Sequence, residues 1–89
     1  MLTTRQLERI VKGFANHRRI EMLKLLDKYP ELSLQDISIK LKINIKTASE
    51  HLRRLTIAGL ILKRNRANSV RHKTSPLGGS ILEFLRKLE

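Results

Sequence analysis

The fold is indicated most clearly by residues 33–60, which read SLQDISIKLKINIKTASEHLRRLTIAGL. Ser33, with an acid three residues later, is typical of a helix N-cap, and Asn44 is a second N-cap shortly after it. Each cap precedes apolar residues at helical spacing, and Gly59 can end the second helix in the left-handed conformation. The stretch therefore predicts two short helices separated by a tight break at residues 42–44.

The helix expected over residues 44–58 has one apolar face and one polar face. At about 100° per residue, Ala48 marks the centre of the apolar face, which also contains Ile45, Leu52 and Leu55. The opposite face carries Lys46, Glu50, Arg53 and Ile57, flanked by Ser49 and Arg54. A short helix, a tight break and a second helix with a polar outward face form a helix-turn-helix, whose second helix enters the major groove of DNA.

The candidate DNA-binding side chains of this recognition helix are Lys46, Thr47, Ser49, Glu50, Arg53 and Arg54. Lys46 and Arg53 can reach acceptors on bases or phosphates, while the short Thr47 and Ser49 side chains let the helix approach closely. Glu50 can accept a hydrogen bond from a cytosine amine, or it can orient Arg53 or Arg54. The residue pattern leaves both roles of Glu50 open.

Two further helices are expected before this pair. The first begins at a capping box formed by Thr3 and Gln6, and it carries the apolar stripe Leu7, Ile10, Val11 and Phe14. Asn16 can cap the second helix, whose inward residues are Ile20, Leu23 and Leu26. Pro30 ends it, because proline has no amide proton and clashes with the preceding turn.

After Gly59 the pattern changes from helix to hairpin. Residues 60–62 have strand character, and residues 70–74 can return antiparallel to them across a polar loop at 65–69. A basic wing is expected over residues 60–75, with candidate DNA contacts at Lys63, Arg64, Arg66 and Arg71. Ser75 and Pro76 begin a last helix with the apolar stripe Ile81, Phe84, Leu85 and Leu88. Four helices, two strands and a final helix predict a mainly α fold with a small β-hairpin, a winged helix-turn-helix.

The charge of the chain indicates a nucleic-acid partner. Its 89 residues carry a formal net charge of +11, and the pI is near 11.0. Residues 38–75 hold ten basic side chains and one acid, so they account for +9 of that charge. A pI above about 9 is typical of nucleic-acid-binding domains. Double-stranded DNA is favoured over RNA, because the chain lacks the interleaved aromatic residues on which single-strand binders stack bases.

The composition argues against several other classes of protein. The chain is expected to form one domain over residues 1–89, without a phosphate loop, a nucleophile–base pair or paired carboxylates, so neither an enzyme nor a cofactor is expected. It has no cysteine, and its three histidines share no ligand spacing, so no metal ion is expected; His51 is interpreted as a structural hydrogen-bonding residue. No apolar run approaches the roughly 20 residues of a membrane span. Because the N-terminus lacks a signal-peptide pattern, a cytoplasmic location without membrane contact is expected.

The run from Phe14 to Ile61 resembles the ArsR-type winged helix-turn-helix transcriptional regulators. The resemblance lies in Arg18, residues 20–26, Asp36-Ile37, Leu41, Thr47-Ala48-Ser49, His51-Leu52, Leu55 and Ala58-Gly59-Leu60. It implies a homodimer on a roughly palindromic operator, with Lys46, Thr47, Ser49, Glu50 and Arg53 facing the bases. The first and last helices would then form the dimer interface through Leu7, Ile10, Val11, Ile81, Phe84, Leu85 and Leu88.

The chain also departs from that family. Many members sense metals through cysteines at the start of the third helix, where this chain reads Glu31-Leu32-Ser33-Leu34. Metal sensing is therefore not expected, and the predicted function is sequence-specific regulation of transcription, with repression as the expected direction. Two alternatives remain open: a winged-helix module that binds an acidic protein, and a non-specific nucleic-acid-binding protein.

Overall fold

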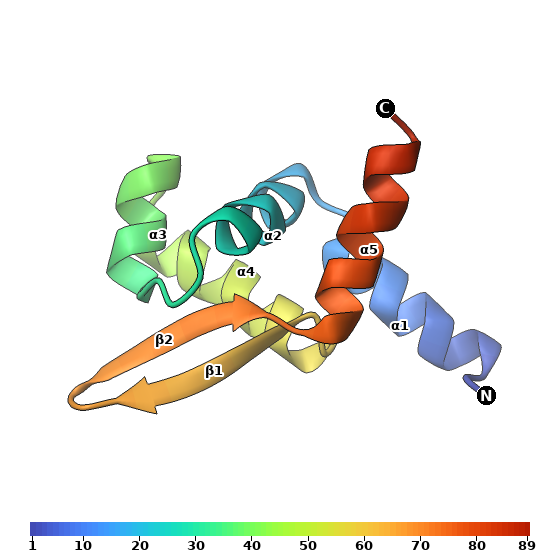
Figure 1. The fold of residues 1–89 in the computed structure, drawn as a ribbon, viewed down its shortest axis with the longest axis horizontal. Coiled ribbons are helices and arrows are strands. Elements are labelled where there is room, and N and C mark those ends of the chain that lie inside the picture. Colours follow the sequence, from blue (N-terminus) through green and yellow to red (C-terminus); the bar gives the residue numbers. More distant parts are fainter.

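A computed structural model describes residues 1–89 and contains five helices and one hairpin (Figure 1). The elements are α1 (Thr4–Phe14), α2 (His17–Lys28), α3 (Leu34–Leu41), α4 (Ile45–Ile57), β1 (Ile61–Arg66), β2 (Ser69–Thr74) and α5 (Pro76–Lys87). This order confirms the mainly helical winged helix-turn-helix with its single β-hairpin. The hairpin projects to one side of the molecule, whereas α1, α5 and both chain ends lie on the other side (Figure 1).

The expected helix caps form as the sequence indicates. Thr3 and Gln6 bond each other reciprocally at the start of α1, and Ser33 and Asp36 do the same at the start of α3. The side chain of Asn44 accepts a hydrogen bond of 2.8 Å from the amide of Lys46 at the start of α4. These bonds satisfy amide groups that have no partner within their own helix, so each boundary is set locally.

The break between α3 and α4 is held by local hydrogen bonds. Lys42 ends α3 in the left-handed conformation, with φ of +56°. The Ser38 hydroxyl donates to the carbonyl of Ile43 over 2.7 Å, and the amide of Ile43 donates to the carbonyl of Ser38 over 3.1 Å. The two helices of the motif are therefore joined by a short turn that is held by hydrogen bonds.

The core is built from the inward faces of α2 and α4, and α1, α3, α5, β1 and Leu60 add one residue each. Its buried hydrophobic residues are Phe14, Met22, Leu23, Leu26, Ile37, Ala48, Leu52, Leu55, Leu60, Ile61 and Leu82. Ala48, Leu52 and Leu55 form the buried face of α4, as expected. Ile45 does not, and 43% of its surface is exposed. It is the first residue of α4, where helical side chains tilt back toward the N-terminal end and so beyond the packed turns.

The hairpin is longer than expected, and one residue outside it also pairs with β2. Antiparallel pairing continues from Ile61↔Thr74 to Arg66↔Ser69, so the loop shrinks to Ala67 and Asn68 instead of spanning 65–69. Leu32, just before α3, forms an isolated bridge with His72 of β2. The amide of His72 donates to the carbonyl of Leu32 over 2.9 Å. The base of the hairpin is thus attached to the segment that leads into the helix-turn-helix.

Candidate nucleic-acid interface

The exposed face of α4 forms a ridge of polar and charged side chains. Lys46, Glu50, Arg53 and Ile57 lie on it, all exposed, and Ile57 is 70% exposed. Thr47 and Ser49 are also exposed and lie beside Lys46. We call the set Lys46, Glu50, Arg53 and Ile57 the α4 ridge. Ile57 does not pack against the hydrophobic core.

Glu50 is fully engaged by the two arginines beside it. Its carboxylate accepts from the Nε and Nη2 of Arg53 at 3.0 and 2.8 Å and from the Nε of Arg54 at 3.0 Å. These hydrogen bonds, that from Arg53 first, lower the pKa of Glu50 to about 2. Of the two roles that the sequence leaves open, the structure has the one in which Glu50 orients Arg53 and Arg54.

His51 joins α4 to the preceding helices. Its Nδ1 accepts a hydrogen bond of 3.2 Å from the Nε of Arg19, whose Nη1 donates to the carbonyls of Lys12 and Gly13 at the end of α1. Burial and the neighbouring Arg19 charge lower the pKa of His51, so its ring is neutral at pH 7. The geometry matches the structural role expected for His51.

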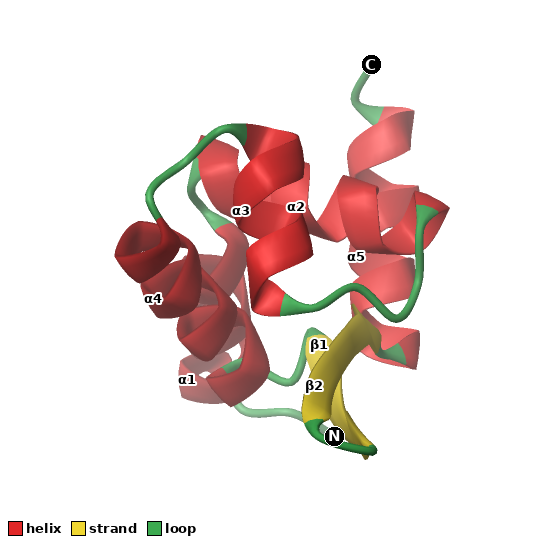
Figure 2. Cartoon of the chain, turned by 90° about the vertical axis from the view of Figure 1, so that its left-hand side faces the viewer, coloured by secondary structure: helices red, strands yellow, loops and turns green.

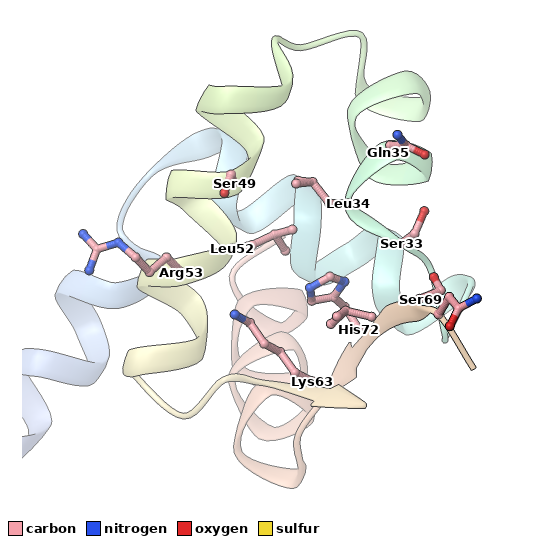
Figure 3. Close-up of a pocket in the computed structure, with 11 residues that line it drawn as sticks. Ser33, Leu34, Gln35, Ser49, Leu52, Arg53, Lys63, Ser69 and His72 are labelled. Atoms are coloured by element: carbon pink, nitrogen blue, oxygen red, sulfur yellow. The ribbon is translucent and has the colours of Figure 1, made fainter. Parts of the chain in front are cut away.

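A cleft of about 410 Å³ lies between the start of α3, one side of α4 and the hairpin (Figure 3). Its lining holds two cations and no acidic side chain: Ser33, Leu34, Gln35, Ser49, Leu52, Arg53, Lys63, Asn68, Ser69, Val70 and His72. Lys63 and His72 extend from the hairpin toward α4, whereas the side chain of Arg53 extends from α4 away from the hairpin (Figure 3). Sequence reasoning missed the contribution of Ser33 and Gln35, although the N-cap at Ser33 was the available signal.

The cations of the hairpin are divided between its two faces. Lys63 pairs with His72 and faces the cleft, while the intervening Arg64 and Arg66 point to the opposite face, together with Arg71. Arg64 forms an ion pair of 3.2 Å with Glu31, and Arg71 forms one of 3.5 Å with Asp36. Lys63 and Arg66 form no ion pair. Of the four expected wing cations, two therefore form ion pairs with acidic residues that lie just before α3 or in its first turn, and two form none.

His72 is a buried residue of the site that the sequence did not single out. It is 4% exposed, and its Nδ1 lies 3.0 Å from the carbonyl of Leu32. Burial lowers the pKa of His72, so the ring is neutral at pH 7 and donates from Nδ1. No local sequence pattern indicates this role of His72, because its contact with Leu32 joins residues 40 positions apart in the chain.

The apolar stripes of α1 and α5 are only partly covered. Ile10, Ile81 and Leu85 pack against the core, whereas Leu7 and Val11 are about half exposed. On α5, Phe84 is 52% exposed and Leu88 is 68% exposed. Each of these helices thus combines residues that complete the core with residues that have no cover within the chain.

No group of three or more His, Asp or Glu side chains is placed to hold a metal ion. None of the helices combines the length and the apolar character that crossing a membrane requires.

Comparison with known proteins gives a family for the chain. A model of the bacterial regulatory proteins of the arsR family matches residues 16–63, which is more than half of the chain. No curated protein matches. Among solved structures, reduced HlyU from Vibrio cholerae is 29% identical, with a TM-score of 0.81, over 96% of this chain and 90% of HlyU.

Two further solved structures are similar. A homodimeric winged helix-turn-helix DNA-binding domain from Mycobacterium bovis, a possible ArsR-family regulator, is 28% identical over 93% of this chain and 76% of its own, with a TM-score of 0.81. NolR from Sinorhizobium fredii shares the fold, with a TM-score of 0.85 at 21% identity over 99% of this chain and 94% of NolR. The family match and the shared winged helix-turn-helix show that this chain belongs to the ArsR family of bacterial regulatory proteins, which are DNA-binding transcription regulators and not enzymes.

Proposed function

We propose that the chain is a homodimeric repressor that recognises a specific sequence of double-stranded DNA through α4 and the hairpin. The observation that carries this proposal is the α4 ridge, which stands beside a cleft lined by two cations and no acid. An α-helix with side chains is about 10–12 Å wide, and the major groove of B-DNA is about 12 Å wide, so α4 fits the groove. The family of the chain supports the same partner.

Within this proposal, the recognition residues divide into three roles. Lys46, Thr47 and Ser49 lie in the first turns of α4, which approach the base edges in a helix-turn-helix. Arg53 reads a base or a phosphate, and Glu50 restricts the side chain of Arg53 to one direction through two hydrogen bonds. This arrangement lowers the conformational entropy that Arg53 loses on binding.

The hairpin supplies phosphate contacts that position the protein. Lys63 and Arg66 have no ion pair and are free to bind phosphate. Arg64 and Arg71 bind Glu31 and Asp36, so we propose that they mainly hold the hairpin in place. Phosphate contacts carry affinity and salt dependence rather than sequence choice.

The proposed dimer uses the uncovered apolar residues of α1 and α5. Leu7, Val11, Phe84 and Leu88 are about half exposed or more, and a second copy would cover them across a two-fold axis. Sedimentation should give twice the chain mass of 10.3 kDa. Phe84→Arg should give the single-chain mass while leaving the far-UV spectrum unchanged, because this side chain contributes little to the core of its own chain. A wild-type protein that is monomeric at micromolar concentration would exclude this interface.

The test of DNA recognition is fluorescence anisotropy with a duplex selected from a random pool, an unselected duplex, single-stranded DNA and structured RNA, each over a salt series. We expect a preference for the selected duplex and affinity that falls steeply with salt. Arg53→Ala should weaken the selected duplex by about 1–3 kcal/mol if Arg53 reads a base, and weaken all duplexes equally if it binds phosphate. A folded protein that binds no duplex at low salt would refute the proposal and favour an acidic protein as the partner.

Repression follows from occupancy, because a dimer bound across a promoter excludes the polymerase without needing a further partner. Transcription in a purified system from a promoter that carries the selected sequence should therefore fall as the dimer is added. The same promoter with the selected sequence scrambled is the control. A rise in transcript would instead identify an activator.

A further inference from the structure

A second hollow lies on the other side of α4 from the cleft. It has a volume of about 330 Å³ and is lined by Arg9, Lys12, Gly13, Arg19, Arg54, Ile57 and Ala58. Four of these seven residues are cations, and none is acidic. We call this hollow the α1–α4 groove. Figures 1 and 2 both place α1 beside α4, and the two helices are in contact.

The cations of the α1–α4 groove are only partly neutralised. Arg9 forms no ion pair, and Lys12 meets Glu8 over 3.5 Å in an exposed pair. Arg54 meets Glu50, which Arg53 shares. Arg19 forms no ion pair and is held in place by His51 and by two backbone carbonyls. Because like charges that converge on one hollow repel each other, the α1–α4 groove is complementary to an anion.

The position of the α1–α4 groove relative to α4 identifies the anion. At about 100° per residue, the α4 ridge lies between the side of Ser49, which lines the cleft, and the side of Arg54 and Ala58, which lines the α1–α4 groove. A helix that occupies the major groove has one sugar–phosphate strand on each of its two sides, because it nearly fills the groove. One strand would therefore pass the cleft, and the other would pass the α1–α4 groove.

We propose that the α1–α4 groove binds backbone phosphates of the duplex strand opposite the hairpin, with Arg9 and Lys12 of α1 as ligands beside Arg54. This inference rests on the proposed function, and it adds α1 to the DNA-binding surface. The side chains of Arg9 and Lys12 lie on the face of α1 opposite Leu7 and Val11, since they are offset from them by about half a helical turn. One helix can thus contact DNA and a second copy of the chain at the same time.

The test compares the variant Arg9→Gln/Lys12→Gln with the control Lys24→Gln/Arg86→Gln. Both variants lose two exposed positive charges, and the control charges lie on α2 and α5, where they pair with Glu89 and Asp27. Each phosphate contact contributes about 0.9 to the slope of log affinity against log salt. The dimer would lose four such contacts, two in each protomer, so we expect the slope of the groove variant to be smaller than that of wild type by about 3.6. Its affinity loss between about 50 and 200 mM salt should then be about a hundredfold smaller. The slope of the control should equal that of wild type.

Chemically modified DNA places the contact on one strand. Single phosphates of the selected duplex are replaced in turn by neutral methylphosphonates. In each half-site, wild-type protein should lose affinity at one or two positions on the strand opposite the hairpin of the protomer bound there, and the groove variant should show no further loss at these positions. Loss by both proteins at the same positions, or equal salt slopes for the groove variant and the control, would overturn the inference while leaving the proposed function intact. Absence of any duplex binding by wild type would overturn both.

Discussion

Two adjacent glycines of α5 provide a direct test of the packing that joins the hairpin to the last helix. Gly78 is buried, and a Cβ added there would overlap the backbone carbonyl of Leu60. A Cβ added at Gly79 would meet nothing within 4 Å. Replacing each glycine with alanine therefore makes the same chemical change in one helix, with a steric penalty at only one of the two positions.

The expected magnitudes follow from these surroundings. Alanine is favoured over glycine in a helix interior by about 1 kcal/mol, so Gly79→Ala should stabilise the fold by roughly that amount. Gly78→Ala has the same favourable helix propensity, but it forces a shift of the Leu60 carbonyl. That carbonyl accepts a hydrogen bond of 3.0 Å from the amide of Ser75. Overpacking costs about 1–3 kcal/mol, and a weakened hydrogen bond costs about 1 kcal/mol more. The two variants should differ in free energy of unfolding by about 3 kcal/mol.

Guanidinium chloride unfolding followed by circular dichroism measures this difference. For a slope of about 3 kcal/mol per M, the midpoints of the two variants should differ by about 1 M. All samples need the same protein concentration, because dimerisation stabilises the folded state by mass action. If Gly78→Ala and Gly79→Ala have the same midpoint, the close approach between α5 and Leu60 does not exist in solution and the reasoning is wrong.

Three further predictions concern pH, the hairpin loop and the start of the recognition helix. The pKa values of His51 and His72 are lowered from 6.5 in the folded state, so the unfolded state binds more protons at acidic pH. The free energy of unfolding should therefore be highest above pH 6.5 and should decrease as the pH falls below it. A denaturation midpoint that is equal at pH 7.5 and 5.5 would contradict this. Ala67 has a φ of +54°, so Ala67→Gly should raise the denaturation midpoint by relieving about 1 kcal/mol of backbone strain. Asn68→Gly is the comparison and should not raise the midpoint, because Asn68 does not have a positive φ. Asn44→Ala should lower stability by about 1 kcal/mol through loss of the N-cap, and Asn44→Asp should retain most of it, both judged by thermal unfolding.

The parts of the fold that depend on neighbouring residues could be predicted from the sequence. Each helix start is set by a cap within three residues, as at Ser33 and Asn44, and local pairing of this kind is visible in the sequence. The exposed face of α4 was also predictable, because the 3.6-residue period places Lys46, Glu50 and Arg53 together whatever the rest of the chain does.

The features that were missed depend on contacts between distant residues. The hairpin is attached through Leu32 and His72, which are 40 positions apart, and through the ion pair of Arg64 with Glu31, which are 33 positions apart. No local pattern reports which partner such a residue finds. The loop was predicted too long for a related reason: residues 65–69 are rich in turn formers, but cross-strand pairing extends the strands to Arg66 and Ser69. Alternation along the strands then decides which cations face the cleft.

The contact between α1 and α4 has a consequence for how two recognition helices would be spaced. A Cβ at Gly13 would overlap that of Ala58, so α1 lies too close to the end of α4 for any side chain at residue 13. Arg19 then ties the end of α1 to His51 of α4. If α1 lies in the dimer interface, its angle to α4 sets the separation of the two α4 helices on DNA, because no flexible segment intervenes. The spacing of the half-sites should therefore be narrowly defined, and inserting one base pair between them should abolish cooperative binding of the dimer without changing the binding of each half-site.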